Sequence, residues 1–176
     1  MVTKEIKSKR EGVLPARETL ILSIVLIVLG TSMHFVHELP FFNKFLGNIF
    51  PVNESVWEHM KMDFYPLLLA AIYLCIRKKD IHPFGGMILA GICAIPVQII
   101  LFYCYWPLSG RPILIIDIIS YIFVLALAIR TGNIWSVSPS IRKTWPLWIA
   151  AAAIVIVALA HLTWHPFDNP IFVVPE

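Results

Sequence analysis

The segment Pro51 to Asp63, with the sequence P-V-N-E-S-V-W-E-H-M-K-M-D, concentrates side chains that can do chemistry and runs directly into the apolar stretch 64–76. Ser55 and His59 are four residues apart, and Asp63 follows four residues later. In a helix these three side chains therefore share one face. An imidazole can bind a metal ion, and a carboxylate can exchange protons with a reacting group. We expect this segment to form one wall of a polar, metal-binding pocket.

A second histidine pair, His161 and His165 in H-L-T-W-H, has the same spacing near the C-terminus. Together with His59 it would provide three nitrogen ligands, and zinc at a catalytic site keeps three protein ligands and one water. The expected catalytic groups are the nearby hydroxyl and carboxyl side chains Ser55, Glu54, Asp63 and Asp117. Three residues at the end of the first apolar run are expected to surround the metal ligands: His34, His37 and Glu38.

Simpler interpretations exist for some of these residues. Ser55 and Glu58 match the capping box S-x-x-E at the start of a helix, and Asn53 could be the N-cap instead. The C-terminal histidine pair could contact lipid headgroups at a membrane interface. Capping does not account for His59, which lies beyond the first turn. The metal-site interpretation and the capping interpretation of this segment are compatible.

The composition indicates that a membrane positions these residues. Hydrophobic residues make up 59% of the 176 residues and charged residues 14%, against about 45–50% and about 25% in a soluble domain. We expect an all-α, polytopic transmembrane bundle forming a single domain, residues 1–176. Residues 1–18 would be a basic cytoplasmic segment and residues 165–176 an outer tail. The five predicted spans, each near the required length of about 20 residues, are 19–37, 54–76, 84–105, 113–129 and 145–164.

The distribution of Lys and Arg predicts the N-terminus inside and the C-terminus outside, since cytoplasmic loops are enriched in these residues. Eleven of the 14 Lys and Arg residues would then lie inside: Lys4, Lys7, Lys9, Arg10, Arg17, Arg77, Lys78, Lys79, Arg130, Arg142 and Lys143. Five of the six histidines would lie near the outer surface. We expect a multi-pass protein of the cell membrane, specifically a bacterial inner membrane. Its partner would be membrane lipid, nothing indicates nucleic acid, and the oligomeric state stays open.

The block N-E-S-V-W-E-H-M-K, preceded by an apolar helix that ends in H-F-V-H-E, resembles an uncharacterised family of small bacterial integral membrane proteins with an N-E-S-x-W-E-H motif. That resemblance covers most of the chain and implies no activity.

The order S-x-x-x-H, an intramembrane Asp and then H-x-x-x-H also resembles the CREST superfamily of intramembrane zinc hydrolases, which includes alkaline ceramidases and adiponectin-receptor-like proteins. This resemblance implies zinc on His59, His161 and His165. Ser55 would stand near the metal-bound water, and Asp117 or Asp63 would take the acidic role. The chain departs from that pattern because the superfamily has seven spans and this sequence predicts five.

These observations support three functions. The first is a zinc-dependent hydrolase that cleaves a lipid amide or ester at the outer leaflet. The second is a transporter of protons, ions or metals, or a sensor, that uses the same histidines and carboxylates, because such groups also form ion paths through membranes. The third is a haem-binding membrane protein. Enzymatic activity is therefore left open by the sequence.

Overall fold

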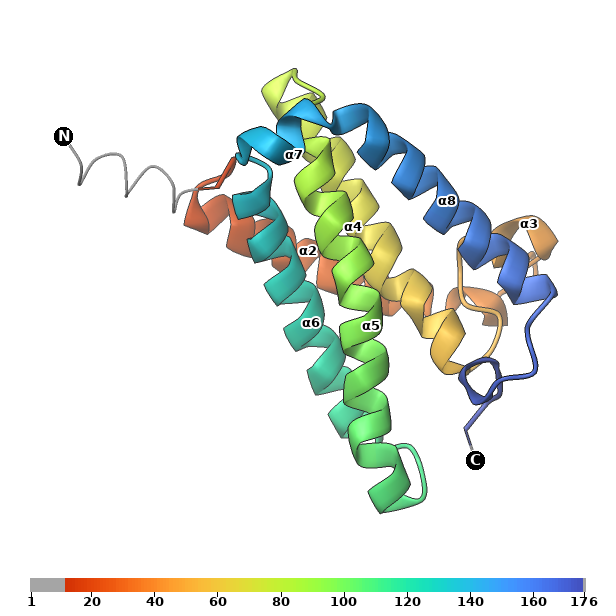
Figure 1. The fold of residues 1–176 in the computed structure, drawn as a ribbon. Helices are drawn as coiled ribbons and strands as arrows, with labels where there is room; N and C mark the ends of the chain where they lie inside the picture. Colours follow the sequence, from red (N-terminus) through yellow and green to blue (C-terminus); the bar gives the residue numbers. More distant parts are fainter. Residues whose placement is uncertain (1–11, 176) are drawn as a thin grey trace.

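The structure is a computed structural model that describes residues 12–175, so most of the basic segment expected at residues 1–18 lies outside the described residues. Within this range all regular structure is helical (Figure 1). Five long helices are each long and apolar enough to cross a membrane, which confirms the predicted polytopic bundle. They are α2 (Ala16–Met33), α4 (Val56–Lys78), α5 (Phe84–Ser109), α6 (Leu114–Trp135) and α8 (Trp145–Trp164). Four short elements join or follow them: η1 (Val36–Glu38), α3 (Lys44–Gly47), α7 (Pro139–Lys143) and η2 (Pro170–Phe172).

Helix α6 shows why one predicted boundary was wrong. The sequence T-G-N after residue 130 looks like a turn, but the helix continues to Trp135. Asn133 is buried there and bonds the backbone of Leu14, accepting from its amide at 2.8 Å and donating to its carbonyl at 2.9 Å. A Cβ at Gly132 would come within 2.7 Å of the Met87 sulfur. These two residues serve helix packing rather than chain reversal.

Helix α4 is the centre of the bundle and packs against α2, α5, α6 and α8 (Figure 1). Its most apolar stretch is 56% buried, against 11–39% for the other four long helices. Helix α4 is therefore surrounded mainly by other helices, whereas much of the surface of its neighbours faces away from the protein. This enclosure lets α4 carry three fully buried charged residues, Glu58, Lys61 and Asp63, because ionisable groups within a membrane normally face the bundle interior.

Local signals explain where α4 begins and ends. Ser55 is the N-cap, and its hydroxyl accepts a hydrogen bond from the Glu58 amide at 3.4 Å. The predicted capping box is therefore half formed, because the Glu58 carboxylate bonds elsewhere. Lys79 ends the helix with a left-handed backbone at φ 52°. Arg77 and Lys78 occupy the last turn, where positive charge is favourable to the helix dipole.

Hydrogen bonds and ion pairs define the two ends of the bundle. At one end, which we call the histidine end, α2 and α4 meet through His34 and Glu54, and α8 reaches the loop before α4 through a bond from Trp164 Nε1 to Asn48 Oδ1 at 2.8 Å. At the other end, which we call the basic end, Arg142 binds Asp80 at 2.7 Å. Helix α8 slants away from α5 on its way to the histidine end (Figure 1).

Candidate metal centre

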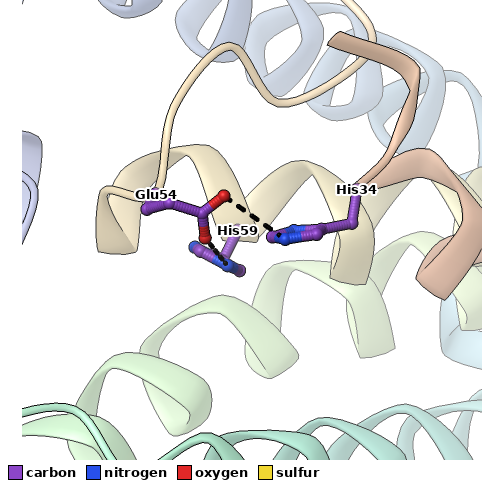
Figure 2. A group of neighbouring side chains, drawn as sticks. All are labelled: His34, Glu54 and His59. Atoms are coloured by element: carbon purple, nitrogen blue, oxygen red, sulfur yellow. Dashed lines mark ion pairs between the residues drawn. The ribbon is translucent and has the colours of Figure 1, made fainter. Parts of the chain in front are cut away.

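Three side chains converge at the histidine end. His34 caps the end of α2, Glu54 lies in the turn before α4, and His59 lies in the first turns of α4. One ligand atom from each lies within 4.8 Å of the other two. Figure 2 shows the Glu54 carboxylate standing between the two imidazole rings. Two nitrogens and one carboxylate oxygen at this spacing can bind a single metal ion.

The distances are compatible with ligands shared by one metal ion and are long for direct hydrogen bonds. His34 Nε2 lies 3.3 Å from Glu54 Oε1, and His59 Nε2 lies 3.7 Å from Glu54 Oε2. Charge-assisted N–H···O bonds are shorter, about 2.7–2.9 Å. Two ligands of one tetrahedral zinc are separated by roughly 3.3 Å, given metal–ligand bonds of about 2.0–2.1 Å. Small side-chain adjustments would bring all three residues onto one ion.

The orientation of His59 leaves its second ring nitrogen, Nε2, facing Glu54. His59 Nδ1 lies 2.8 Å from the Ser55 carbonyl oxygen, and a carbonyl can only accept, so Nδ1 carries the hydrogen. In the neutral ring Nε2 then presents a lone pair toward the Glu54 carboxylate. Lone pair and carboxylate repel each other unless a proton or a metal ion lies between them. A backbone carbonyl that fixes the second nitrogen is also the usual support of a metal-binding histidine.

His37 and Glu38 lie beside the cluster on η1. His37 Nδ1 donates to the His34 carbonyl at 2.8 Å, and the two rings meet edge to face with centroids 6.2 Å apart. His37 therefore contacts His34 directly, and its predicted place around metal ligands stays a prediction. Glu38 is exposed, and its carboxylate forms no ion pair within residues 12–175.

The centre is open to its surroundings. The side chains of His34, Glu54 and His59 are 27%, 51% and 35% exposed. A structural zinc site is closed by four protein ligands, whereas a catalytic site keeps a position for water or substrate. If these three residues bound zinc, a position for water or substrate would remain open.

The structure does not bring His161 and His165 to His59, so the predicted three-histidine set is not assembled. Both residues are exposed, and their rings stack on each other with centroids 4.7 Å apart. In this last turn of α8, Thr163 faces the bundle, and its hydroxyl donates to Glu58 Oε1 at 2.8 Å. Positions two residues from Thr163 in either direction fall on the opposite side of a helix with 3.6 residues per turn. The i, i+4 spacing was therefore interpreted correctly as one face, but that face points outward.

The four predicted catalytic residues do not converge on one point. The Ser55 hydroxyl is buried and serves as the helix cap. Asp63 is fully buried below the centre, and no group within residues 12–175 donates to either of its oxygens. Asp117 accepts a hydrogen bond from the Tyr105 hydroxyl at 2.5 Å, between α5 and α6. Of the four predicted residues, only Glu54 belongs to the metal cluster.

A buried ion pair between Lys61 and Glu58 lies next to the cluster. Lys61 Nζ donates to Glu58 Oε2 at 2.6 Å, to the Gly47 carbonyl at 2.6 Å and to the Phe50 carbonyl at 3.2 Å. The Val52 amide also donates to Glu58 Oε2, at 3.0 Å. This network fixes the loop before α4 and so places Glu54, two residues past Val52. The sequence signal for this pair is the opposite charge of Glu58 and Lys61 at i, i+3. The capping interpretation assigned Glu58 to the helix start instead.

Fold and site together define a multi-pass helical membrane protein with a candidate metal centre at one end of the bundle. The chain belongs to a family of unknown function (DUF6512), whose model matches residues 9–174. The family assignment covers nearly the whole chain and carries no activity. No curated protein and no solved structure matches the chain.

Proposed function

We propose that this protein is a zinc-dependent hydrolase that cleaves an amide or ester bond of a membrane lipid at the outer leaflet, with the metal bound by His34, Glu54 and His59. The observation that carries the proposal is the placement of two imidazole Nε2 atoms against one carboxylate, at 3.3 and 3.7 Å. The Ser55 carbonyl holds one of these rings in the metal-binding orientation.

The donor set favours zinc. Two histidines and one glutamate with an open position are a ligand set of catalytic zinc sites. Magnesium and calcium prefer oxygen ligands, so two imidazole nitrogens make these ions poor candidates. When bound, zinc lowers the pKa of its water to about 7 and so supplies hydroxide at neutral pH. A carboxylate in the ligand set keeps the net charge of the site low.

The surroundings favour a lipid substrate. The segment after η1 exposes Phe41 and Phe45, at 63% and 72%, and large apolar side chains at a helix bundle's end insert into the headgroup region of a bilayer. Lys44 lies 5.7 Å from the Trp164 ring centroid in the same region. A lipid carbonyl at headgroup depth would therefore stand level with the metal centre.

Proton transfer would fall to the accessible groups beside the metal, half-buried His37 and exposed Glu38. Ser55 and Asp63 are buried, which removes two of the predicted catalytic residues from substrate. His37 keeps Nδ1 on the His34 carbonyl, which leaves its Nε2 to exchange a proton with a leaving group. Glu38 is the neighbouring carboxylate and is exposed.

We place the histidine end outside and the basic end in the cytoplasm of a bacterial cell. The support is the concentration of Lys and Arg at the basic end and the rule that cytoplasmic segments carry them. Kinship with the CREST hydrolases is also a proposal. The hydrolytic chemistry proposed for this chain comes from its own ligand set, which differs from the three histidines that the resemblance implied.

The test is the zinc content of detergent-purified protein, with turnover of fluorescent lipid amides and esters in proteoliposomes. We expect about one zinc per chain, lost in His34→Ala, Glu54→Gln and His59→Ala together with turnover. The matched control is the double variant His161→Ala/His165→Ala, which should keep both. Zinc at background in the wild type, or zinc lost only in the control, would refute the proposed centre. Normal zinc without lipid turnover would refute the hydrolase.

A second candidate, an ion or proton path, is favoured by one observation. Asp63 lies one helical turn deeper than His59 and is 0% exposed. Intramembrane carboxylates often mark such paths. This candidate predicts proton or zinc flux into proteoliposomes that is abolished by Asp63→Asn, while the hydrolase predicts that Asp63→Asn leaves lipid turnover in place.

A further inference from the structure

The basic end of the bundle carries an open pocket of about 410 Å³, far from the metal centre. Its lining residues are His82, Val137, Pro139, Arg142 and Lys143. They come from the loop between α4 and α5 and from the segment that leads into and forms α7. Three of the five lining side chains are basic and none is acidic. A pocket with this lining favours an anionic ligand.

Asp80 organises the basic groups without entering the pocket. Its Oδ2 accepts from Arg142 Nη2 at 2.7 Å, and its Oδ1 accepts from the His82 amide at 3.1 Å and from His82 Nδ1. The bonds from His82, and then those from Arg142, lower the pKa of Asp80 to about 2. The carboxylate is therefore charged at neutral pH and holds both neighbours in fixed positions.

Hydrogen-bonding capacity remains for a ligand. A guanidinium has five N–H groups. Within residues 12–175 the Arg142 side chain donates only to Asp80, so its other N–H groups are available to a ligand. Lys143 is exposed and forms no ion pair in the same part of the chain. Because His82 Nδ1 faces Asp80, the nitrogen left for the pocket is Nε2. Arg and Lys in combination bind phosphate oxygens well.

The pocket lies at headgroup depth. The His82 ring meets Trp145 at 6.4 Å between centroids, and Trp is enriched at membrane–water interfaces. Trp145 is the first residue of α8, and α5 starts two residues after His82. Further exposed Lys and Arg residues occupy the same end of the spans: Arg77, Lys78, Lys79 and Arg130. Their summed field attracts anions to this surface.

We propose that this pocket binds the phosphate of an anionic phospholipid headgroup, with Arg142 and Lys143 as its principal contacts. Basic pockets between helices at the cytoplasmic face are suited to acidic headgroups, and a volume of about 410 Å³ accommodates a phosphate together with its glycerol. The site is separate from the metal centre and does not depend on the hydrolase proposal.

The experiment is native mass spectrometry of the full chain in detergent with added dioleoyl phosphatidylglycerol, dioleoyl phosphatidylcholine or inorganic phosphate. We expect one preferred phosphatidylglycerol adduct in the wild type. Lys143→Gln should weaken it about fivefold, and Arg142→Gln/Lys143→Gln should weaken it further. The control Lys78→Gln/Arg130→Gln removes one Lys and one Arg from the same end outside the pocket, and it should change the affinity less than twofold.

Three outcomes would overturn the proposal. An equal loss in the control would assign binding to the general field of the basic end. Equal binding of phosphatidylcholine would remove the requirement for an anionic headgroup. Binding of inorganic phosphate that depends on Lys143, without a phosphatidylglycerol adduct, would replace the lipid by free phosphate. Lys143→Gln leaves the Asp80 contacts intact, so its result stands even if Arg142→Gln impairs folding.

Discussion

Lys61 Nζ lies 2.6 Å from Glu58 Oε2, and the two side chains are only 0% and 2% exposed. This ion pair joins three parts of the chain, because Lys61 also binds two carbonyls of the loop before α4 while Glu58 binds Val52 and Thr163. Every oxygen of Glu58 is thereby satisfied. The pair fixes the loop that carries Glu54 and links α4 to α8 next to the candidate metal centre.

Removing one partner of this pair should destabilise the protein strongly. Lys61→Met leaves a buried carboxylate without its cation, and breaking a buried pair in this way costs about 3–5 kcal/mol. The double variant Glu58→Gln/Lys61→Met should lose less than the sum of the two single variants, because neither charge is then left alone. Thermal unfolding in detergent measures this difference. Additive losses would show that the pair has no energetic coupling.

A close approach at Gly30 should also be sensitive to substitution. A Cβ at this position would come within 2.0 Å of the Tyr121 hydroxyl oxygen and 3.1 Å of the Met62 carbonyl. Overpacking of this kind costs about 1–3 kcal/mol. Because Gly30 lies one turn before His34 on α2, Gly30→Ala should also reduce zinc binding. We expect lower thermal stability and lower zinc content in this variant.

Two further variants separate that clash from a general effect of alanine. Gly30→Ala/Tyr121→Phe removes the nearest clashing atom and should recover part of the stability. Gly91→Ala places a Cβ at 3.3 Å from the Phe64 ring, which a side chain can accommodate, so its effect should stay small. Equal losses in Gly30→Ala and Gly91→Ala would contradict the packing argument.

The helical bundle could be predicted from the sequence because lipid imposes a simple requirement. Each span needs about 20 apolar residues, and α8 was predicted from Trp145 to Trp164 as observed. Helix α6 was predicted too short because Gly and Asn are residue types common in turns, whereas the packing use of Gly132 and Asn133 depends on neighbours distant in sequence. Such contacts leave no local signal.

The candidate site was predicted only in part for a related reason. The spacing of His161 and His165 determines that they share a face, but not which way α8 turns that face. The two residues that the structure places beside His59 come from the ends of neighbouring segments, at His34 and Glu54. Their convergence depends on the path of the loop between α2 and α4, which the buried pair of Glu58 and Lys61 fixes.

The hydrogen bonds at the basic end predict a pH-dependent stability. His82 and then Arg142 lower the pKa of Asp80 from 3.8 to about 2. A group whose pKa is lower in the folded state stabilises the fold above its ordinary pKa, and this stabilisation is lost as the pH falls from about 4 toward 2. For a partly exposed pair we expect of the order of 1 kcal/mol.

The measurement compares the melting temperatures of the wild type and Asp80→Asn in detergent at pH 7 and pH 3. The wild type should be the more stable at pH 7, and the difference should shrink at pH 3. Asp117→Asn is a suitable control, since it replaces a carboxyl group on another part of the bundle. A difference that is constant with pH would show that the charge of Asp80 is not what stabilises this end.

The buried carboxyl of Asp63 gives the most direct comparison of the two candidate functions. No group within residues 12–175 donates to it, and placing an ionisable side chain within a membrane costs roughly 2.5–3.5 kcal/mol on insertion scales. Asp63→Leu should therefore raise the melting temperature while zinc content and lipid turnover persist. Asp63→Leu that melts higher but abolishes ion flux would accordingly favour the ion path over the hydrolase, and a lower melting temperature would show that Asp63 has a stabilising partner.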